Sequence, residues 1–398
     1  MTADVQHLRS VRAADVYKAG RLAARLERGD GASTVFTYDG NYGQQGGPPV
    51  ATTLPVKETP VTTASGGVPA FFAGLLPEGH RLTVLRNAIK TSPDDELSLL
   101  MAVGADAPGD VQVVPVGTPP AEPEPLADTA HLQNVDFSRL ATALDLHALP
   151  GVQEKASASM LTAAPVAAAE KRYILKLDPP EHAHLVANEA LHLAAARRLR
   201  IPVATAQTVV DRHGVPGLLV ERFDRRQLGS GWSRTALEDA CQVMGLAPAA
   251  KYTCTSEEVV RALAEQTAAP LVATRNLYLQ FVFSWLSGNG DLHAKNVSVL
   301  AGVDGRFEVA PVYDVPCTLL YDDRTQALPV DGRTKNLRAS HWAAFARAIG
   351  LPERAAHSAN ALALRAASAV DLHALPFHGS PLRFAERELR QRRSELAN

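Results

Sequence analysis

The chain has 398 residues, of which 46% are hydrophobic and 21% charged, a composition typical of a soluble globular protein with two or three domains. Its formal net charge of −2 excludes an overall basic field that would attract nucleic acid. It has no apolar stretch long enough to span a bilayer and no signal-peptide core at its start, so we expect a cytoplasmic protein.

The first part of the chain, residues 1–116, is predicted to be a β-rich unit. Short alternating segments at 16–17, 23–28 and 34–38 predict strands separated by glycine turns. Asp94, Asp95 and Glu96 precede an apolar run and predict a helix through Met101, because acidic residues favour the first turn of a helix. A further strand is expected at 111–116.

A proline-rich stretch separates this unit from the rest of the chain. Residues 117–125 contain four prolines, and proline removes backbone donors and favours extended chain. We therefore predict a linker over 117–130.

The second half is predicted to begin with strands and to become helical. Strands are expected at 173–177, 206–211 and 217–223, the last two as a hairpin, and an amphipathic helix at 185–199. A second hairpin is expected from 297–299 and 307–309. Further helices are predicted at 235–244, 256–264, 273–287, 341–348 and 380–397.

Cysteines and histidines give little indication of a metal site. The three cysteines, at 241, 254 and 317, lack metal-ligand spacing, which favours a reducing compartment. His182 and His184 could ligate a metal, but no cysteine or third histidine lies nearby, so a solvated pair is favoured. Arginines near the C-terminus alternate with glutamates, which favours a solvated helix face over a nucleic-acid site.

The most informative segment runs from Gly288 to Asn296. Asp291 is followed by Asn296 at the spacing Asp-x4-Asn, and Asp314 lies beyond the second hairpin. In phosphoryl transfer a first carboxylate can orient or deprotonate a hydroxyl, while an amide and a second carboxylate can hold Mg²⁺ on ATP oxygens. A single Asp-x4-Asn match is most often a capping or turn element. The combination with His293, Lys295 and Asp314 is much more specific.

A lysine on a predicted strand supports the same chemistry. Lys176 alternates with apolar neighbours, and Glu189 on the next helix is its natural ion-pair partner. Kinases use a strand lysine and a helix glutamate in this way to position ATP phosphates. Taken alone, a strand lysine that reaches to solvent would be the better interpretation.

Two further segments could contact a nucleotide. The stretch before Lys176 is not a Walker A loop, but its glycine, backbone amides and lysine could hold phosphate oxygens; its residues are Pro150, Gly151, Val152, Gln153, Glu154 and Lys155. The strand end Glu221-Arg222-Phe223 could present its backbone to adenine, with Phe223 as an apolar contact. By itself, that segment is only a strand end.

Together these segments resemble the HipA-type serine/threonine kinase toxins of bacterial type II toxin–antitoxin modules. The resemblance covers almost the whole chain through motifs that are specific only in combination. They are Leu54-Pro55-Val56, the segments 71–79, 99–100 and 103–106, Gly151 to Lys155, 174–177, Asn188-Glu189, 220–225, Ala250-Lys251-Tyr252, 289–296 and Tyr313-Asp314.

The resemblance implies an α+β fold and a kinase site. The fold would have the β-rich accessory subdomain (1–116), the linker, a mixed β/helical ATP-binding part (131–250) and a largely helical C-terminal part (251–398). The implied roles are Asp291 as catalytic base, His293 as its support, Asn296 and Asp314 as Mg²⁺ ligands, Lys176 on ATP phosphates, residues 150–155 as phosphate loop, Glu221, Arg222 and Phe223 beside adenine, and Lys295 as a further cofactor contact.

The resemblance also implies partners. Family members phosphorylate an aminoacyl-tRNA synthetase and arrest growth, and a helix-turn-helix antitoxin (HipB-like) neutralises them and binds operator DNA with them. One departure stands out, because the serine that well-studied members autophosphorylate is replaced here by Ala148. We therefore expect this chain to stay active or to be restrained only by its partner.

Two alternatives stay open at this point. A kinase of the same fold could act on a different protein or a small molecule, because a fold alone does not define a substrate. A non-catalytic corepressor could instead bind an antitoxin and DNA.

Overall fold

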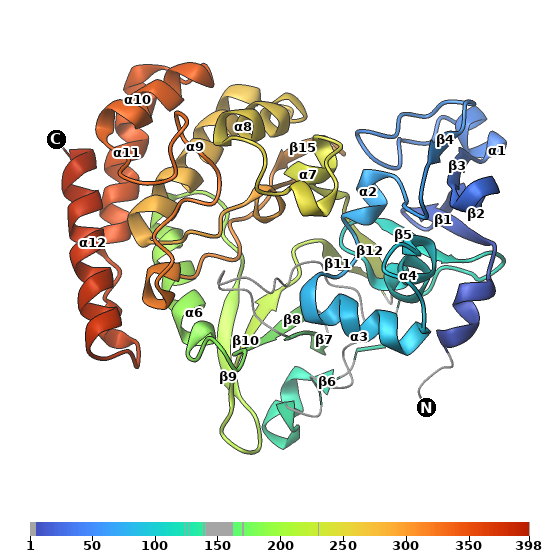
Figure 1. Cartoon of the computed structure of the whole chain (residues 1–398), viewed down its shortest axis with the longest axis horizontal. Helices are drawn as coiled ribbons and strands as arrows, with labels where there is room; N and C mark the ends of the chain where they lie inside the picture. Colours follow the sequence, from blue (N-terminus) through green and yellow to red (C-terminus); the bar gives the residue numbers. More distant parts are fainter. Residues whose placement is uncertain are drawn as a thin grey trace.

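The computed structural model describes residues 5–122, 124–125, 127–137, 140, 162–168, 171–229 and 231–397. Among these residues, buried apolar side chains form three clusters, which involve residues 8–113, 132–219 and 185–396. Figure 1 shows the corresponding arrangement, with the blue N-terminal part on the right, a sheet at the lower centre, and the orange and red C-terminal helices on the left.

The N-terminal part is an antiparallel sheet with short helices packed on it. The strand order is β4-β3-β2-β1-β5, with bounds β1 Ala13–Lys18, β2 Arg21–Arg28, β3 Thr34–Tyr38, β4 Val61–Thr63 and β5 Val111–Pro115. The helices are α1 Gly40–Gln44, α2 Ala70–Ala73, α3 Gly79–Ile89 and α4 Glu96–Val103. Asp95 caps α4 by accepting a hydrogen bond from Ser98 N.

The central sheet carries the predicted lysine strand. Its order is β6-β7-β8-β10-β9, with bounds β6 Ala127–Asp128, β7 Thr162–Ala168, β8 Lys171–Leu177, β9 Ala206–Val210 and β10 Pro216–Glu221. The predicted hairpin of β9 and β10 is confirmed, and β8 pairs with β10 so that Lys176 lies opposite Leu218. Helix α6, Leu185–Ala196, follows β8 as expected, and Asp178 accepts the backbone N–H groups of His184 and Val186 at its start.

The C-terminal part is mainly helical. Its helices are α7 Ala240–Val243, α8 Ser256–Glu265, α9 Pro270–Ser287, α10 Ala339–Ala348, α11 Glu353–Ser368 and α12 Ser380–Ala397. The short sheet β13-β14-β15 accompanies them, with bounds Leu237–Asp239, Ser298–Ala301 and Phe307–Val309. Between the central sheet and these elements, β11 Arg225–Leu228 pairs with β12 Gly231–Arg234. Helix α9 is buried along most of its length, which fixes the loop that begins at Gly288.

One predicted helix is wrong. Residues 235–244 are not a continuous helix, because residues 237–239 form β13 and pair with β14. The helix α7 begins only after Asp239, whose side chain accepts from Gln242 N and caps it. Pairing with the β14–β15 hairpin overrides the local helical pattern here. The sequence patterns predict no helix where α1, α2, α3 and α11 lie.

Contacts tie the N-terminal part to the rest of the chain. Glu238 of β13 accepts the backbone N–H and the hydroxyl of Thr52, and Arg222 forms a buried ion pair with Asp106. Among the described residues, none of the helices is both long enough and apolar enough to cross a membrane.

Candidate active site

Lys176 joins two carboxylates from distant parts of the chain. Its Nζ lies 2.9 and 3.0 Å from the two carboxylate oxygens of Glu189 on α6, and 3.1 Å from Asp314 Oδ1. The Glu189 side chain is fully buried, whereas 23% of the Asp314 side chain is exposed. The structure therefore brings Lys176 to the predicted partner Glu189 and also to the predicted metal ligand Asp314.

Charge pairing keeps this lysine ionised. Burial alone would lower the pKa of Lys176, but the carboxylates of Asp314 and Glu189 outweigh it and raise the pKa above the usual value. Burial raises the pKa of Glu189, and the Lys176 ammonium opposes that shift. The Lys176 ammonium thus pairs with two carboxylates, of which only that of Asp314 is partly exposed to solvent.

Asp314 reaches this position through an unusual backbone conformation. Its φ of 54° lies in the left-handed region, which aspartate adopts more readily than most residues. The preceding Tyr313 is held by its hydroxyl, which donates to the carbonyl of Lys295 at 2.9 Å and lies 2.6 Å from Ser298 Oγ. The Tyr313 hydroxyl therefore joins the Asp314 turn to β14 and to the loop that precedes it.

The loop after α9 presents Asp291 at the same site. Gly288 ends α9 with a φ of 78°, a conformation that glycine adopts without strain. Asn289 Oδ1 accepts the backbone N–H of Asp291 at 2.9 Å, and Asn289 Nδ2 reaches the carbonyl of Asp314 at 3.4 Å. Asn296 Nδ2 donates to the carbonyl of Asp291 at 2.9 Å. Asp291, Asn296 and Asp314 are thus held in one hydrogen-bonded unit.

Asp291 is a buried carboxylate with an altered acidity. Its Oδ1 accepts a hydrogen bond of 3.0 Å from the hydroxyl of Tyr252. Burial, followed by the nearby Asp314 carboxylate, raises the pKa of Asp291 to about 7, although Tyr252 and Lys251 oppose that shift. A carboxylate with a pKa near neutrality is suited to take up a proton at physiological pH.

His293 lies beside Asp291 as a neutral side chain. Burial, followed by the ammonium groups of Lys251 and Lys295, lowers the pKa of His293 well below its usual value. Its Nδ1 accepts the backbone N–H of Lys295 at 3.3 Å, and its Nε2 lies 3.9 Å from Asp291 Oδ1. The Tyr252 ring packs edge-on against the imidazole, with ring centroids 5.1 Å apart. The supporting role of His293 stays a prediction.

Lys295, a predicted cofactor contact, turns toward the N-terminal part. Its Nζ donates to the carbonyl of Gly74 at 3.1 Å and lies 2.6 Å from Glu78 Oε1. Lys251 Nζ approaches the other oxygen of Glu78, also at 2.6 Å. The ammonium of Lys295 is therefore engaged by Glu78, and a nucleotide contact stays a prediction.

The three side chains of the segment expected beside adenine contact different parts of the structure. Glu221 pairs with Lys171 at 2.7 Å, and the Phe223 ring packs against Tyr313 with centroids 5.9 Å apart. The guanidinium of Arg222 is buried between Asp106 and Asp224. The backbone N–H of Arg222 also donates to the carbonyl of Arg172 at 2.8 Å, so Arg222 could contribute to a nucleotide site only through its carbonyl.

The predicted phosphate loop falls outside the described part of the chain. This applies to all its residues, Pro150, Gly151, Val152, Gln153, Glu154 and Lys155, and to Ala148. Their roles stay predictions.

Four residues of the site were missed or left without a role by the sequence interpretation. Tyr252 and Lys251 belong to the motif Ala250-Lys251-Tyr252, and Asn289 belongs to the segment 289–296. Membership of these motifs is the sequence feature that could have indicated a role for them. Glu78 also stood in a quoted segment, but its distance along the chain concealed its contact with both lysines. These contacts depend on tertiary packing.

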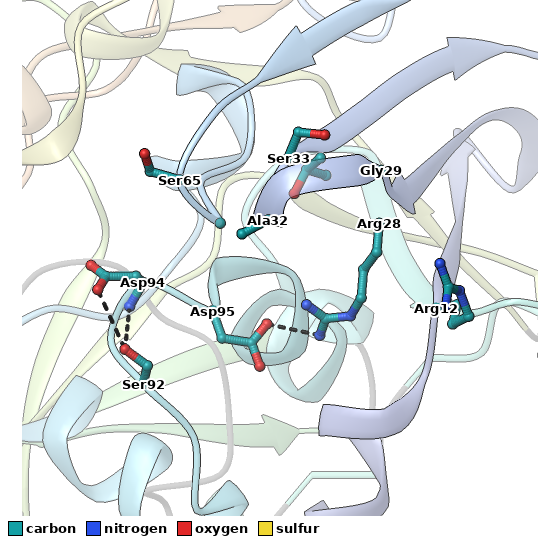
Figure 2. A pocket seen from close by; sticks show the side chains of 11 residues that line it. Arg12, Arg28, Gly29, Ala32, Ser33, Ser65, Ser92, Asp94 and Asp95 are labelled. Atoms are coloured by element: carbon teal, nitrogen blue, oxygen red, sulfur yellow. Dashed lines mark hydrogen bonds and ion pairs between the residues drawn. The ribbon is translucent and has the colours of Figure 1, made fainter.

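A separate hollow of about 390 Å³ lies on the N-terminal part. Figure 2 shows Arg28 pointing to Asp95, and Asp94 beside Ser92, while Arg12 lies at the far side. This hollow contains none of the predicted site residues. It is therefore distinct from the cluster around Asp291.

Comparison with known proteins agrees with this arrangement. A family model described as the HipA-like C-terminal domain matches residues 147–370, and a second, the HipA N-terminal domain, matches residues 14–114. The chain belongs to the HipA-like family. Its family assignment thus rests on both halves of the chain, as the resemblance predicted.

Individual relatives span most of this HipA-like chain. It is 28% identical over 371 residues to a "Putative kinase Y4mE" of Sinorhizobium fredii, covering 86% of this chain and 87% of that protein. It is 28% identical over 340 residues to a "Serine/threonine-protein kinase toxin HipA" of Shewanella oneidensis, covering 78% and 77%.

A solved structure has the same fold. The match is a chain from the Shewanella oneidensis MR-1 complex of HipA, HipB and operator DNA, with a TM-score of 0.72 and 22% identity over 96% of each chain. The predicted α+β fold, with a β-rich N-terminal part and a helical C-terminal part, is confirmed.

Proposed function

We propose that this chain is an ATP- and Mg²⁺-dependent serine/threonine protein kinase that acts as the toxin of a toxin–antitoxin pair. The observation that carries the proposal is the cluster of Lys176, Glu189 and Asp314 beside the loop of Asp291 and Asn296. Its parts correspond to those that phosphoryl transfer requires.

Asp291 would act as the base. Its carboxylate would accept the proton of a serine or threonine hydroxyl while the hydroxyl oxygen bonds to the γ-phosphorus of ATP and the bond to the ADP oxygen breaks. Tyr252 and the backbone contacts of Asn289 and Asn296 would hold that carboxylate in place. The pKa of about 7 suits this role, because a base is most effective when its pKa lies near the working pH.

Lys176 would hold the ATP phosphates. The ammonium stays charged beside Glu189 and Asp314, so it can attract phosphate oxygens when ATP binds. The Phe223 backbone and the Arg222 carbonyl would face adenine, because the backbone N–H groups of Glu221 and Arg222 already bind the carbonyls of Thr205 and Arg172. Residues 150–155 would cover the phosphates. Lys295 would contact the nucleotide only if its ammonium left Glu78 and Gly74, which engage it in this structure.

The oxygen groups around Asp314 fit a magnesium ion. Asn296 uses its side-chain Nδ2 to bind Asp291, so its side-chain Oδ1 is available as a ligand. The Asp314 carboxylate is partly exposed. The described residues contain no set of three His, Cys, Asp or Glu side chains arranged for a metal. Magnesium needs none here, because one or two protein oxygens suffice when ATP phosphates complete its shell. When bound, the ion would neutralise phosphate charge.

We further propose the partners that the family suggests. A HipB-like helix-turn-helix antitoxin would bind the chain, and operator DNA would be reached only through that complex. The solved relative that shares the fold is a complex of HipA, HipB and operator DNA, which supports this proposal. The substrate would be an aminoacyl-tRNA synthetase or another component of translation.

Transfer of labelled phosphate tests the activity. Purified protein is incubated with Mg²⁺, γ-phosphate-labelled ATP and a bacterial lysate, and we expect label on serine or threonine of a lysate protein that mass spectrometry identifies. Asp314→Asn should abolish the transfer. Asp304→Asn is the matched control, because it makes the same change on the exposed tip of the β14–β15 hairpin.

Each result has a distinct meaning. Undiminished transfer by Asp314→Asn would contradict the site assignment, and no transfer by the wild type would contradict the kinase. Co-purification of a short helix-turn-helix protein expressed with the chain tests the antitoxin, and its absence would contradict that partner.

A further inference from the structure

The N-terminal part contributes one carboxylate to the surroundings of the catalytic loop. Glu78 lies in the turn between α2 and α3, far from the catalytic loop in sequence. Its two oxygens lie 2.6 Å from the ammonium groups of Lys251 and Lys295. Lys295 directs a hydrogen bond to the carbonyl of Gly74, in the same turn. Two lysines of the C-terminal part thus converge on one short segment of the N-terminal part.

All three charges are shielded from solvent. The side chains of Lys251 and Lys295 are 2% and 3% exposed, and that of Glu78 is 14% exposed. Burial alone would raise the pKa of Glu78, but the two ammonium groups outweigh it and lower the pKa, so the carboxylate is ionised. Removing the charge of Glu78 would leave two buried ammonium groups close together without the group that pairs both.

Each lysine is adjacent in sequence to a residue of the active site. Lys251 precedes Tyr252, which donates to Asp291, and Lys295 precedes Asn296, which binds the Asp291 carbonyl. The carbonyl of Lys251 also accepts the backbone N–H of Ala294 at 3.2 Å. Glu78 therefore closes a link between the two segments that hold Asp291 from either side.

Other contacts already join the two parts of the molecule. Thr52 binds Glu238, and Arg222 binds Asp106, and neither contact involves Lys251 or Lys295. Because these contacts can hold the N-terminal part in place, the double pairing of Glu78 has a more specific consequence. It fixes the side chains that flank Tyr252 and Asn296.

We propose that Glu78 is a positioning residue for phosphoryl transfer. By pairing Lys251 with Lys295, it holds Tyr252 and Asn296 where they orient Asp291, and so the N-terminal part completes the active site. This inference rests on the proposed kinase function and adds a residue that touches neither nucleotide nor hydroxyl.

Charge-balanced variants of the full-length protein test this role. Glu78→Gln should lower kcat for protein phosphorylation roughly 10- to 100-fold, because small displacements of reacting groups cost rates of that size. The KM for ATP should stay within about twofold, because Lys176 and Asp314 are untouched. Adding Lys251→Met removes one of the two unpaired ammonium groups, so the double variant should recover part of the lost kcat.

A control and a substitute variant complete the test. Glu238→Gln alters another buried carboxylate between the same two parts, so it should leave kcat within about twofold of the wild type. If Glu78→Gln does not fold, Glu78→Asp replaces it. The shorter carboxylate cannot keep both contacts at 2.6 Å, so kcat should again fall at unchanged KM.

Failure of this inference is distinguishable from failure of the kinase proposal. A wild type without phosphoryl transfer would refute the kinase. With an active wild type, the positioning role is overturned by undiminished kcat in the Glu78 variant. It is also overturned if the double variant is no better than Glu78→Gln, since a simple fastening contact would not respond to charge balance.

Discussion

Two clusters of buried charge in this molecule are built differently. Arg222 and Arg225 meet Asp106 and Asp224 between the N-terminal part and the central sheet, with side chains no more than 9% exposed. Arg222 binds Asp224 through two parallel contacts, from Nε at 3.0 Å and from Nη2 at 2.9 Å. The cluster around Lys176 instead has a single ammonium against the two carboxylates of Glu189 and Asp314.

The difference separates a structural cluster from a functional one. Arg225 also meets Glu122, which pairs with Arg234, so three guanidinium groups balance three carboxylates in the first cluster. The planar donors of arginine suit such closed pairing. The second cluster has two carboxylates against one ammonium, and part of Asp314 faces solvent. The proposed Mg²⁺ would approach Asp314 from this exposed side. Burial of charged side chains alone does not identify a functional site. An unequal number of carboxylates and cations, together with exposure to solvent, is the more informative sign.

The largest expected effect concerns Asp291. Asp291→Asn keeps the shape of the side chain but cannot take up a proton, so we expect phosphoryl transfer to fall about 10²- to 10⁴-fold. Expression of the wild type should arrest growth and expression of the variant should not. Asp322→Asn, on an exposed turn, is the matched control and should arrest growth like the wild type. Equal arrest by Asp291→Asn would favour the non-catalytic corepressor.

The sequence predicted the acid-rich cluster better than the balanced one. The strand and helix patterns placed Lys176 and Glu189 on neighbouring elements, and the hairpin pattern placed Asp314 after the Asp291 loop. These elements lie close together in the sequence or are joined by recognisable turns. The observed pairing of Lys176 with Glu189 confirms this part of the prediction.

Contacts between distant segments could not be predicted in the same way. Nothing local to Glu78 indicates Lys251 or Lys295, and nothing local to Asp106 indicates Arg222. The helix predicted over 235–244 failed for a related reason, because residues 237–239 pair with β14 instead. Tertiary pairing decides these cases, and local propensity is only a weak guide to it.

Lys176 is expected to matter for both activity and stability. Lys176→Met leaves Glu189 and Asp314 without their shared ammonium, so we expect loss of most kcat and destabilisation of about 3–5 kcal/mol. Adding Glu189→Gln should restore part of the stability, measured by urea unfolding, and none of the activity. Recovery of activity in the double variant would show that Lys176 only neutralises Glu189, and its proposed phosphate contact would then be wrong.

In the arginine cluster around Arg222, a substitution should reduce stability and leave activity nearly unchanged. Asp106→Asn removes a carboxylate that Arg222 and Arg225 share, so stability should fall by about 3–5 kcal/mol. Phosphoryl transfer per folded molecule should stay within about twofold of the wild type, because the lost charge is paired away from Asp291. The comparison between the clusters would fail if kcat fell strongly while the urea midpoint stayed unchanged.

The smallest expected effect is a change in how stability depends on pH. The pKa of Asp291 is raised to about 7 in the folded protein, above the value of about 3.9 for an unfolded chain. As the pH rises, Asp291 therefore loses its carboxyl proton in the unfolded chain before it does so in the folded protein. Stability from the protonated side chain is therefore present below pH 4 and is lost as the pH rises to 7. Asp291→Asn cannot ionise, so it should be more stable than the wild type at pH 8, on the order of 1–4 kcal/mol, and not at pH 4.

Urea unfolding without Mg²⁺ or nucleotide measures this difference, and Asp322→Asn should show none, because its side chain is 80% exposed. A wild type that is the more stable protein at pH 8 would mean that the fold stabilises the ionised form of Asp291. Asp291 would then resemble Asp224 of the arginine cluster, whose neighbours favour the ionised carboxylate. Burial and the nearby Asp314 carboxylate would not dominate the pKa of Asp291.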